Sequence, residues 1–179
     1  MYSEIIIAGS GGQGVLVLGE VLAIGNIKNG GKSTWLPAYG AAMRGGTANC
    51  SVVLSDEEIG SPMVEEPDIL VCFNQPSLVK FSPQLAPGGV IFANDDAIDS
   101  WPELREDIGV VKVKAQSIAL ELGNERCINT VMLGAVLKRC PLITLARAQE
   151  ALSEIWGEER SARLMPVNSK ALRAGYDSV

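Results

Sequence analysis

A run of glycines that follows a short apolar segment constrains the fold of this chain most. The apolar residues 5–8, within a strand predicted over 4–8, lead into Gly9-Ser10-Gly11-Gly12-Gln13-Gly14, and a helix-like pattern begins directly after this motif. In a G-x-G-x-x-G motif, the first glycine permits the turn, the second lets the backbone approach a ligand, and the third lets the helix pack on the strand. The N–H groups of the first helical turn then point at an anion, typically a phosphate. We therefore predict a strand, a glycine turn and a helix that extends to about Ile27, and an empty turn is the alternative to a phosphate site. The candidate ligand-binding or interface residues of this turn are Gly9, Gly11, Gly12, Gln13 and Gly14.

Strand-like and helix-like segments alternate along the rest of the chain. Apolar runs predict strands over 32–36, 47–55, 69–73, 90–93 and 110–113. Helical spacing predicts helices after Pro76 and over 127–137, 145–156 and 161–174, with one helical turn over 41–46 and a turn or loop over 37–40. This order predicts an α/β fold with a Rossmann-like, doubly wound and mostly parallel sheet that has helices on both faces. A chain of 179 residues fits a single domain over 1–179.

Charge and apolar patterning exclude two classes of partner. The net charge is −6 and there is no basic cluster, so the electrostatic footprint of a nucleic-acid-binding protein is missing. The longest apolar-rich stretch, 15–27, is too short to span a bilayer. The N-terminus does not read as a secretory leader, so we expect a cytoplasmic protein.

The cysteine and histidine content limits what this chain can catalyse. Cys50, Cys72, Cys127 and Cys140 show no C-x-x-C spacing, which disfavours zinc or iron–sulfur ligation and favours buried free thiols. The sequence contains no histidine, so no Ser-His-Asp or Cys-His catalytic pair can form within it. We expect no metal site here, and we expect the reacting groups of any enzyme it serves to lie on other chains.

Two nucleotide-binding hypotheses each lack a residue that their motif requires. Gly30-Gly31-Lys32-Ser33-Thr34 resembles part of a P-loop, but Asn26 stands where that motif needs a glycine, and a helix pattern rather than a strand precedes it. A dinucleotide site needs an acidic residue at the end of the second strand, and residues 32–36 supply none. A stand-alone NAD(P)-binding oxidoreductase therefore remains only as an alternative.

Several strings together carry a family resemblance. With the glycine motif, Pro37-Ala38-Tyr39-Gly40, Met43-Arg44-Gly45-Gly46 and Asn49-Cys50-Ser51 occur in order along the chain. The chain resembles the gamma subunit of the 2-oxoacid:ferredoxin oxidoreductases, which act on pyruvate, 2-oxoglutarate or 2-oxoisovalerate. The resemblance continues nearly to the end of the chain through Ser61-Pro62, Pro67-Asp68, Leu85-Ala86-Pro87-Gly88-Gly89, Asn129 and Gly134.

The resemblance implies a subunit that is not catalytic alone. Such an enzyme oxidatively decarboxylates a 2-oxoacid, forms an acyl-CoA and reduces ferredoxin. The implied partners are alpha, beta and ferredoxin-like subunits, and thiamine diphosphate, Mg and the iron–sulfur clusters would reside on them. The gamma-type chain would help assembly and help form the site where coenzyme A or substrate enters, although a purely structural subunit is an alternative.

The candidate roles outside the glycine turn each have a structural alternative. Arg44 between flexible glycines offers a planar fork of donors to a carboxylate or phosphate, or forms a structural salt bridge. Tyr39 and Trp35 are candidate interface anchors, with core packing the alternative for Trp35. Asn74 and Asn94 follow strands where open α/β sheets bind ligands, but asparagine also serves such turns locally. The remaining candidates, which would allow close approach of a ligand or a subunit, are Gly45 and Gly46.

Overall fold

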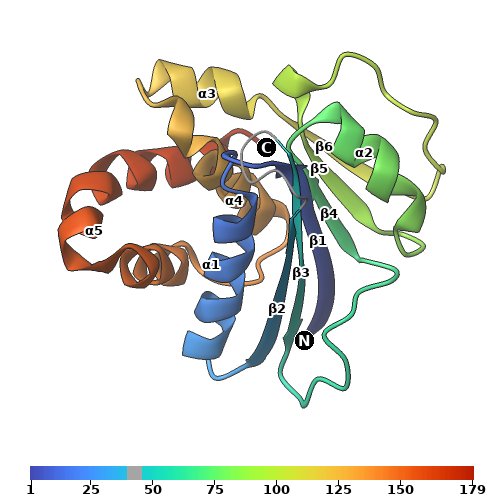
Figure 1. Ribbon diagram of the computed structural model, residues 1–179, viewed down its shortest axis with the longest axis horizontal. Helices are drawn as coiled ribbons and strands as arrows, with labels where there is room; N and C mark the ends of the chain where they lie inside the picture. Colours follow the sequence, from blue (N-terminus) through green and yellow to red (C-terminus); the bar gives the residue numbers. More distant parts are fainter. Residues whose placement is uncertain (40–45) are drawn as a thin grey trace.

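The structure, a computed structural model, describes residues 1–39 and 46–179 (Figure 1). Its strands are β1 (Tyr2–Ser10), β2 (Lys32–Tyr39), β3 (Thr47–Ser55), β4 (Ile69–Cys72), β5 (Val90–Asn94) and β6 (Gly109–Val113). Its α-helices are α1 (Val15–Lys28), α2 (Gln75–Phe81), α3 (Ala115–Glu121), α4 (Ile128–Arg139) and α5 (Leu145–Asp177). Short 3-10 helices cover Ser82–Gln84, Asp95–Ala97 and Glu125–Cys127. The six predicted strands and the five predicted helices are confirmed, the last two of these helices lying within α5, and α3 is an addition.

The strands form one sheet in the order β2-β3-β1-β4-β5-β6. β1, β4, β5 and β6 pair in parallel, which confirms the mostly parallel α/β sheet. β3 runs antiparallel to both of its neighbours, β1 and β2. In a dinucleotide-binding half the second strand lies directly beside the first. Here β3 separates them.

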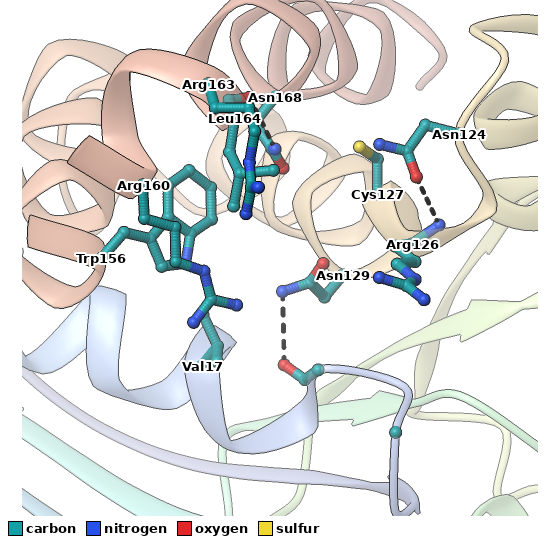
Figure 2. A pocket seen from close by; sticks show the side chains of 12 residues that line it. Val17, Asn124, Arg126, Cys127, Asn129, Trp156, Arg160, Arg163, Leu164 and Asn168 are labelled. Carbon is teal, nitrogen blue, oxygen red and sulfur yellow. Dashed lines mark hydrogen bonds between the residues drawn. The ribbon is translucent and has the colours of Figure 1, made fainter.

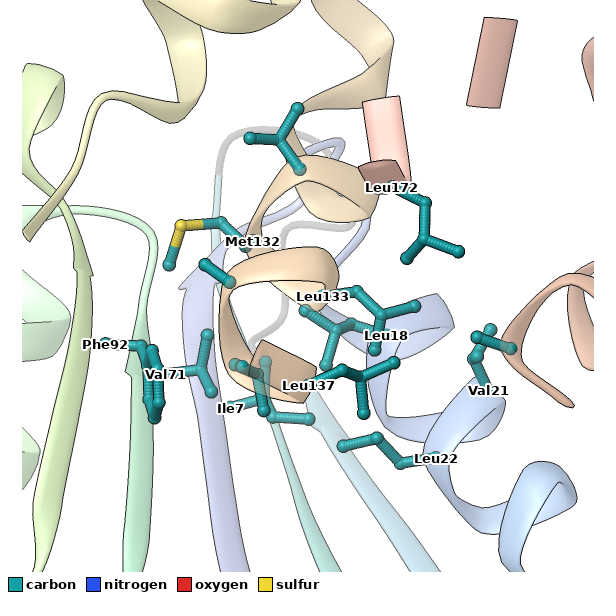
Figure 3. Packing of buried hydrophobic residues seen from close by; sticks show 14 of the residues in the cluster. Ile7, Leu18, Val21, Leu22, Val71, Phe92, Met132, Leu133, Leu137 and Leu172 are labelled. Atoms are coloured by element: carbon teal, nitrogen blue, oxygen red, sulfur yellow. The ribbon is translucent and has the colours of Figure 1, made fainter. Parts of the chain in front are cut away.

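Helices cover both faces of the sheet. Alternate residues of the strands point to opposite faces, so Ile5 and Ile7 contact one layer while Ile6 and Ala8 contact the other. The larger layer holds α1, α3, α4 and α5, and Figure 3 shows Val71 and Phe92 of the sheet facing the side chains of α4 and α1. The smaller layer holds α2 and the segment 98–108. Each fully buried large apolar side chain contributes about 1.5–3 kcal/mol, so this core needs no disulfide.

The predicted turn over 37–40 is wrong for its first three residues. β2 continues to Tyr39, and Pro37 lies opposite Cys50 of β3. Because β2 is an edge strand, a proline that cannot donate to a ladder is tolerated there. The predicted helical turn over 41–46 lies outside the described residues except for Gly46.

α5 contains a sharp break that separates two arms. Gly157 has φ 71° and ψ 170°, a conformation that glycine adopts with little strain, whereas the arms 145–156 and 158–177 are helical. The Ser161 hydroxyl donates to Ser153 Oγ at 2.9 Å, which ties the second arm to the first. α5 packs on both α1 and α4 and curves around them (Figure 1). The sequence prediction of two separate helices is therefore correct in substance.

The segment 98–108 is fastened by an ion pair that should respond to acid. Arg105 donates to Asp107 Oδ1 at 3.0 Å and to the carbonyl groups of Leu85 and Ala86 at 3.0 and 3.1 Å. The hydrogen bond from Arg105, followed by one from the Gly88 N–H, lowers the pKa of Asp107 to about 2 from 3.8. Since the folded pKa is the lower one, this contribution is present above about pH 4 and is lost as the pH falls toward 2.

We expect Asp107→Asn to lower the thermal midpoint at neutral pH and to flatten its fall between pH 4 and pH 2. The effect is modest because both side chains of the pair are about half exposed, at 47% and 44%. Thermal unfolding at several pH values measures it, and the same acid dependence in both proteins would show that the Arg105 contact does not stabilise the fold.

Candidate functional site

The glycine turn joins the end of β1 to the start of α1. Gly9 lies within β1, and a Cβ added there would stand 2.7 Å from Phe73 Cβ, so close packing with the neighbouring strand requires glycine. The turn itself depends on Gly12 and Gly14, whose φ values are 98° and 76°. The Gly11 N–H donates to the carbonyl of Gly46 at 2.8 Å, so the start of β3 contacts the turn. The glycines thus serve two needs: close packing at Gly9 and left-handed backbone at the other two positions.

Gln13 and Asn74 make local hydrogen bonds that shape the turn. Gln13 Oε1 accepts from the Ser10 N–H at 2.7 Å. Asn74 Nδ2 donates to Ser10 Oγ at 2.9 Å, while its Oδ1 caps α2 by accepting from the Ser77 N–H at 3.0 Å. These contacts give Asn74 its local alternative role, and they give Gln13 a local role within the turn as well. Asn94 is also buried, and its Nδ2 donates to the Phe73 carbonyl at 3.4 Å.

The start of α1 presents its first-turn backbone N–H groups without a side-chain cap. Gly14 is its N-cap and has no side chain to accept from the first-turn N–H groups, and the first turn holds no acidic residue. α4 differs, because it continues directly from the 3-10 helix Glu125–Cys127, whose N-cap Asn124 accepts from the Arg126 N–H. The positive end of the helix dipole therefore favours an anion at the start of α1.

A cavity of about 650 Å³ lies where the two helix starts and α5 meet (Figure 2). Three arginines from distant parts of the sequence line it, and none of the lining residues among 1–39 and 46–179 is an aspartate or glutamate. Figure 2 shows Arg160 and Arg163 on the α5 wall and Arg126 on the wall that precedes α4. The lining residues are Gly12, Gly14, Val17, Asn124, Arg126, Cys127, Asn129, Trp156, Arg160, Arg163, Leu164 and Asn168. This set of donors fits a phosphorylated or carboxylated ligand.

Buried amides hold the walls of this cavity together. Asn129 Nδ2 donates to the Gly14 carbonyl at 3.4 Å, which links the start of α4 to the start of α1. The Thr130 hydroxyl donates to Asn168 Oδ1 at 2.6 Å, and Asn168 Nδ2 donates to the Leu164 carbonyl at 2.9 Å. Thr130 and Asn168 are buried, so these bonds fix the second arm of α5 against α4.

The predicted site residues are only partly brought together. Gly12 and Gly14 line the cavity, whereas Gly9, Gly11, Gln13 and Asn74 support the turn behind it. The backbone of Tyr39 ends β2 opposite Ala48, but its side chain lies outside the described part of the structure, as do Arg44 and Gly45. Sequence reasoning missed the arginines and Trp156. Arg160 and Arg163 are three residues apart and so share one face of the second arm. Trp156 lies before the break at Gly157, so helical spacing gives no local signal that it joins them.

Other groups of the chain fit structural roles. Lys32 pairs with Glu58 at 2.8 Å at the other end of β2, so it does not serve a phosphate loop. Trp35 packs on the core, which favours its structural alternative. Burial raises the pKa of the Cys50 thiol to about 12 and raises the pKa of the Cys72 thiol as well.

Within residues 1–39 and 46–179, no three histidine, cysteine, aspartate or glutamate side chains are grouped so as to hold a metal ion. In the same ranges, no helix combines the length and apolarity needed to cross a membrane.

Comparison with known proteins agrees with the resemblance seen in the sequence. Subunit VorA of the ketoisovalerate oxidoreductase of Methanothermobacter marburgensis is 44% identical over 131 residues, or 73% of this chain, and the matched part is 27% of VorA. This chain thus spans about a quarter of that relative's length. The common subunit gamma of the pyruvate/ketoisovalerate oxidoreductases of Thermococcus kodakarensis is 30% identical, and the match covers 97% of this chain and 95% of that subunit.

A solved structure shares the fold. The 2-oxoglutarate:ferredoxin oxidoreductase of Magnetococcus marinus, solved with 2-oxoglutarate, coenzyme A and succinyl-CoA bound, superposes with a TM-score of 0.84 at 23% identity. The superposition covers 99% of this chain and 31% of that one. Residues 4–178 of the sequence also match the protein family described as "Pyruvate ferredoxin/flavodoxin oxidoreductase". This chain therefore belongs to the pyruvate ferredoxin/flavodoxin oxidoreductase family.

Proposed function

We propose that this chain is the gamma subunit of a multi-subunit 2-oxoacid:ferredoxin oxidoreductase. The holoenzyme would oxidatively decarboxylate a 2-oxoacid, transfer the acyl group to coenzyme A and pass the electrons to ferredoxin. The match to a subunit named gamma, which covers nearly all of both chains, supports this assignment. The family to which the chain belongs also supports it.

The chain would not catalyse this reaction alone. It has no histidine, and burial raises the pKa of its thiols, so it lacks the usual groups for acid–base or thiolate chemistry near neutral pH. Thiamine diphosphate, Mg and the iron–sulfur clusters would belong to the alpha, beta and ferredoxin-like subunits. The gamma chain would contribute binding and assembly.

The arginine-lined cavity is the observation that carries a binding role. Arg126, Arg160 and Arg163 bring three positive charges to one cavity whose described lining holds no acidic residue, beside the uncapped start of α1, which favours anions. Both substrates of such an enzyme are anions, but coenzyme A carries several phosphates and therefore the larger negative charge. We propose that this cavity receives its phosphates, and that Tyr39, Arg44, Gly45 and Gly46 serve the adjoining entry site or a subunit contact. Gly46 supports this placement because its carbonyl binds the Gly11 N–H of the turn.

A double substitution tests the cavity. Arg160→Ala with Arg163→Ala should raise the KM for coenzyme A at least about tenfold in the reconstituted complex, because two charge-assisted contacts are lost. The KM for the 2-oxoacid should not change. Arg173→Ala is the matched control, since Arg173 is an exposed arginine of the same helix that does not line the cavity. An unchanged KM for coenzyme A in the double variant would show that the cavity is not part of the coenzyme A site.

Co-purification from the native host tests the assignment itself. A tagged chain should bring down thiamine- and iron–sulfur-bearing subunits with coenzyme A-dependent reduction of ferredoxin or a viologen by a 2-oxoacid. A chain that elutes alone and binds NAD(P) would instead support the stand-alone oxidoreductase. Assembly without any effect of cavity variants on coenzyme A would support a purely structural subunit.

A further inference from the structure

Trp156 is an aromatic residue in a cavity that is otherwise suited to phosphates. It is the last residue of the first arm of α5 and is only half-buried. It lines the arginine-lined cavity and also an outer groove of about 660 Å³ that follows residues 156–163. Figure 2 shows its indole beside Arg160 on the α5 wall, above Val17 of α1. An aromatic plane thus lies next to a guanidinium at the rim of the site.

The backbone break at Gly157 produces this arrangement. Its φ of 71° turns the chain immediately after Trp156, so that the next helical turn carries Arg160 beside the indole. A residue with a side chain adopts this conformation only under strain, and a Cβ at this position would meet nothing within 4 Å. The hydrogen bond between Ser161 and Ser153 holds the two arms together beside the break. The ring and the arginine are therefore positioned as a unit.

The chemistry of this unit exceeds what a phosphate needs. Arginines and helix N-termini suffice for a phosphate, whereas the part of an indole that lines a cavity can stack on the aromatic base of a nucleotide. We propose that Trp156 is the stacking platform for the base of a nucleoside diphosphate-type group whose phosphates contact Arg126, Arg160 and Arg163. Trp156 thereby makes the cavity specific for base-bearing over base-free diphosphates. This inference rests on the proposed function of the cavity and adds the class of ligand that it selects.

Titration of the full chain with ADP and with inorganic pyrophosphate tests the stacking role. We expect wild-type protein to bind ADP about tenfold more tightly than pyrophosphate, and Trp156→Leu to raise the Kd for ADP about tenfold without changing the Kd for pyrophosphate. Trp156→Phe should restore most of the ADP affinity. ADP should quench tryptophan fluorescence in the wild type but not in Trp156→Phe, which retains Trp35 and Trp101.

The possible failures separate this inference from the cavity's proposed function. If wild-type protein binds pyrophosphate but binds ADP no more tightly, the stacking role is wrong and the phosphate site stands. If Trp156→Leu raises the Kd for ADP and for pyrophosphate equally, Trp156 only packs the α5 wall, and the stacking role is also wrong. A lower melting temperature of the variant would report this loss of packing. If neither probe binds, both the phosphate cavity and the stacking role are overturned.

Discussion

Gly134→Ala should destabilise the protein by about 3 kcal/mol or more and lower its melting temperature by roughly 6–12 °C. Gly134 lies where α4 crosses α5, and a Cβ there would overlap the carbonyl oxygen of Leu172 in the α5 backbone. Gly175 is its counterpart on α5, where a Cβ would overlap the carbonyl oxygen of Val131. A backbone cannot move aside as a side chain can. The helices would have to separate, and the buried residues of both would lose contact.

Thermal and urea unfolding of Gly134→Ala and Gly175→Ala measure this effect. Gly60→Ala is the matched control, because a Cβ at Gly60 meets nothing within 4 Å and its φ is ordinary. We expect the control to change stability by less than about 0.5 kcal/mol. A Gly134 variant as stable as the control would mean that the α4–α5 crossing is not closely packed in solution.

The secondary structure could be predicted because its signals are local. In α1, for example, the apolar residues Val15, Leu18, Val21 and Leu22 recur at helical spacing, and all four are buried in the structure. The order of the strands could not be predicted in the same way. The insertion of β3 between β1 and β2 depends on contacts between residues far apart in the sequence, such as Ile7 with Cys50. A proline in β2 also looks like a chain break until β2 is known to lie at the sheet edge.

The candidate site shows the same difference between local signals and contacts that are distant in the sequence. The glycine turn was evident because all its residues are contiguous and their conformational needs are specific to glycine. The arginines were not, because Arg126 reaches the turn through the start of α4, and Arg160 reaches it only after α5 turns at Gly157. Asn129 was marked by family resemblance alone. Its contact with Gly14 now gives a physical reason for an amide at that position.

Gly14→Ala should lower stability by about 2–3 kcal/mol and weaken ligand binding in the cavity. Two separate terms add at this position. The φ of 76° strains any residue with a side chain, and the new Cβ would stand 2.6 Å from both Cγ and Nδ2 of Asn129. Asn129 is buried at 8% exposure, so it cannot swing freely into solvent. Moving it would displace the start of α4 from the start of α1, where the proposed phosphate donors lie.

Gly12→Ala isolates the strain term, because Gly12 has φ 98° in the same turn but open space around its Cβ position. We expect it to cost about 1 kcal/mol, and the difference between the two variants measures the contact with Asn129. Combining Gly14→Ala with Asn129→Ala should recover part of that difference, since the amide that the new methyl group meets is gone. Equal losses in Gly12→Ala and Gly14→Ala, with no recovery in the double variant, would show that Asn129 does not hold α1 and α4 together. If the double variant recovers stability but not ligand affinity, the Asn129 amide also contacts the ligand directly. Its removal then accounts for the affinity that is not recovered.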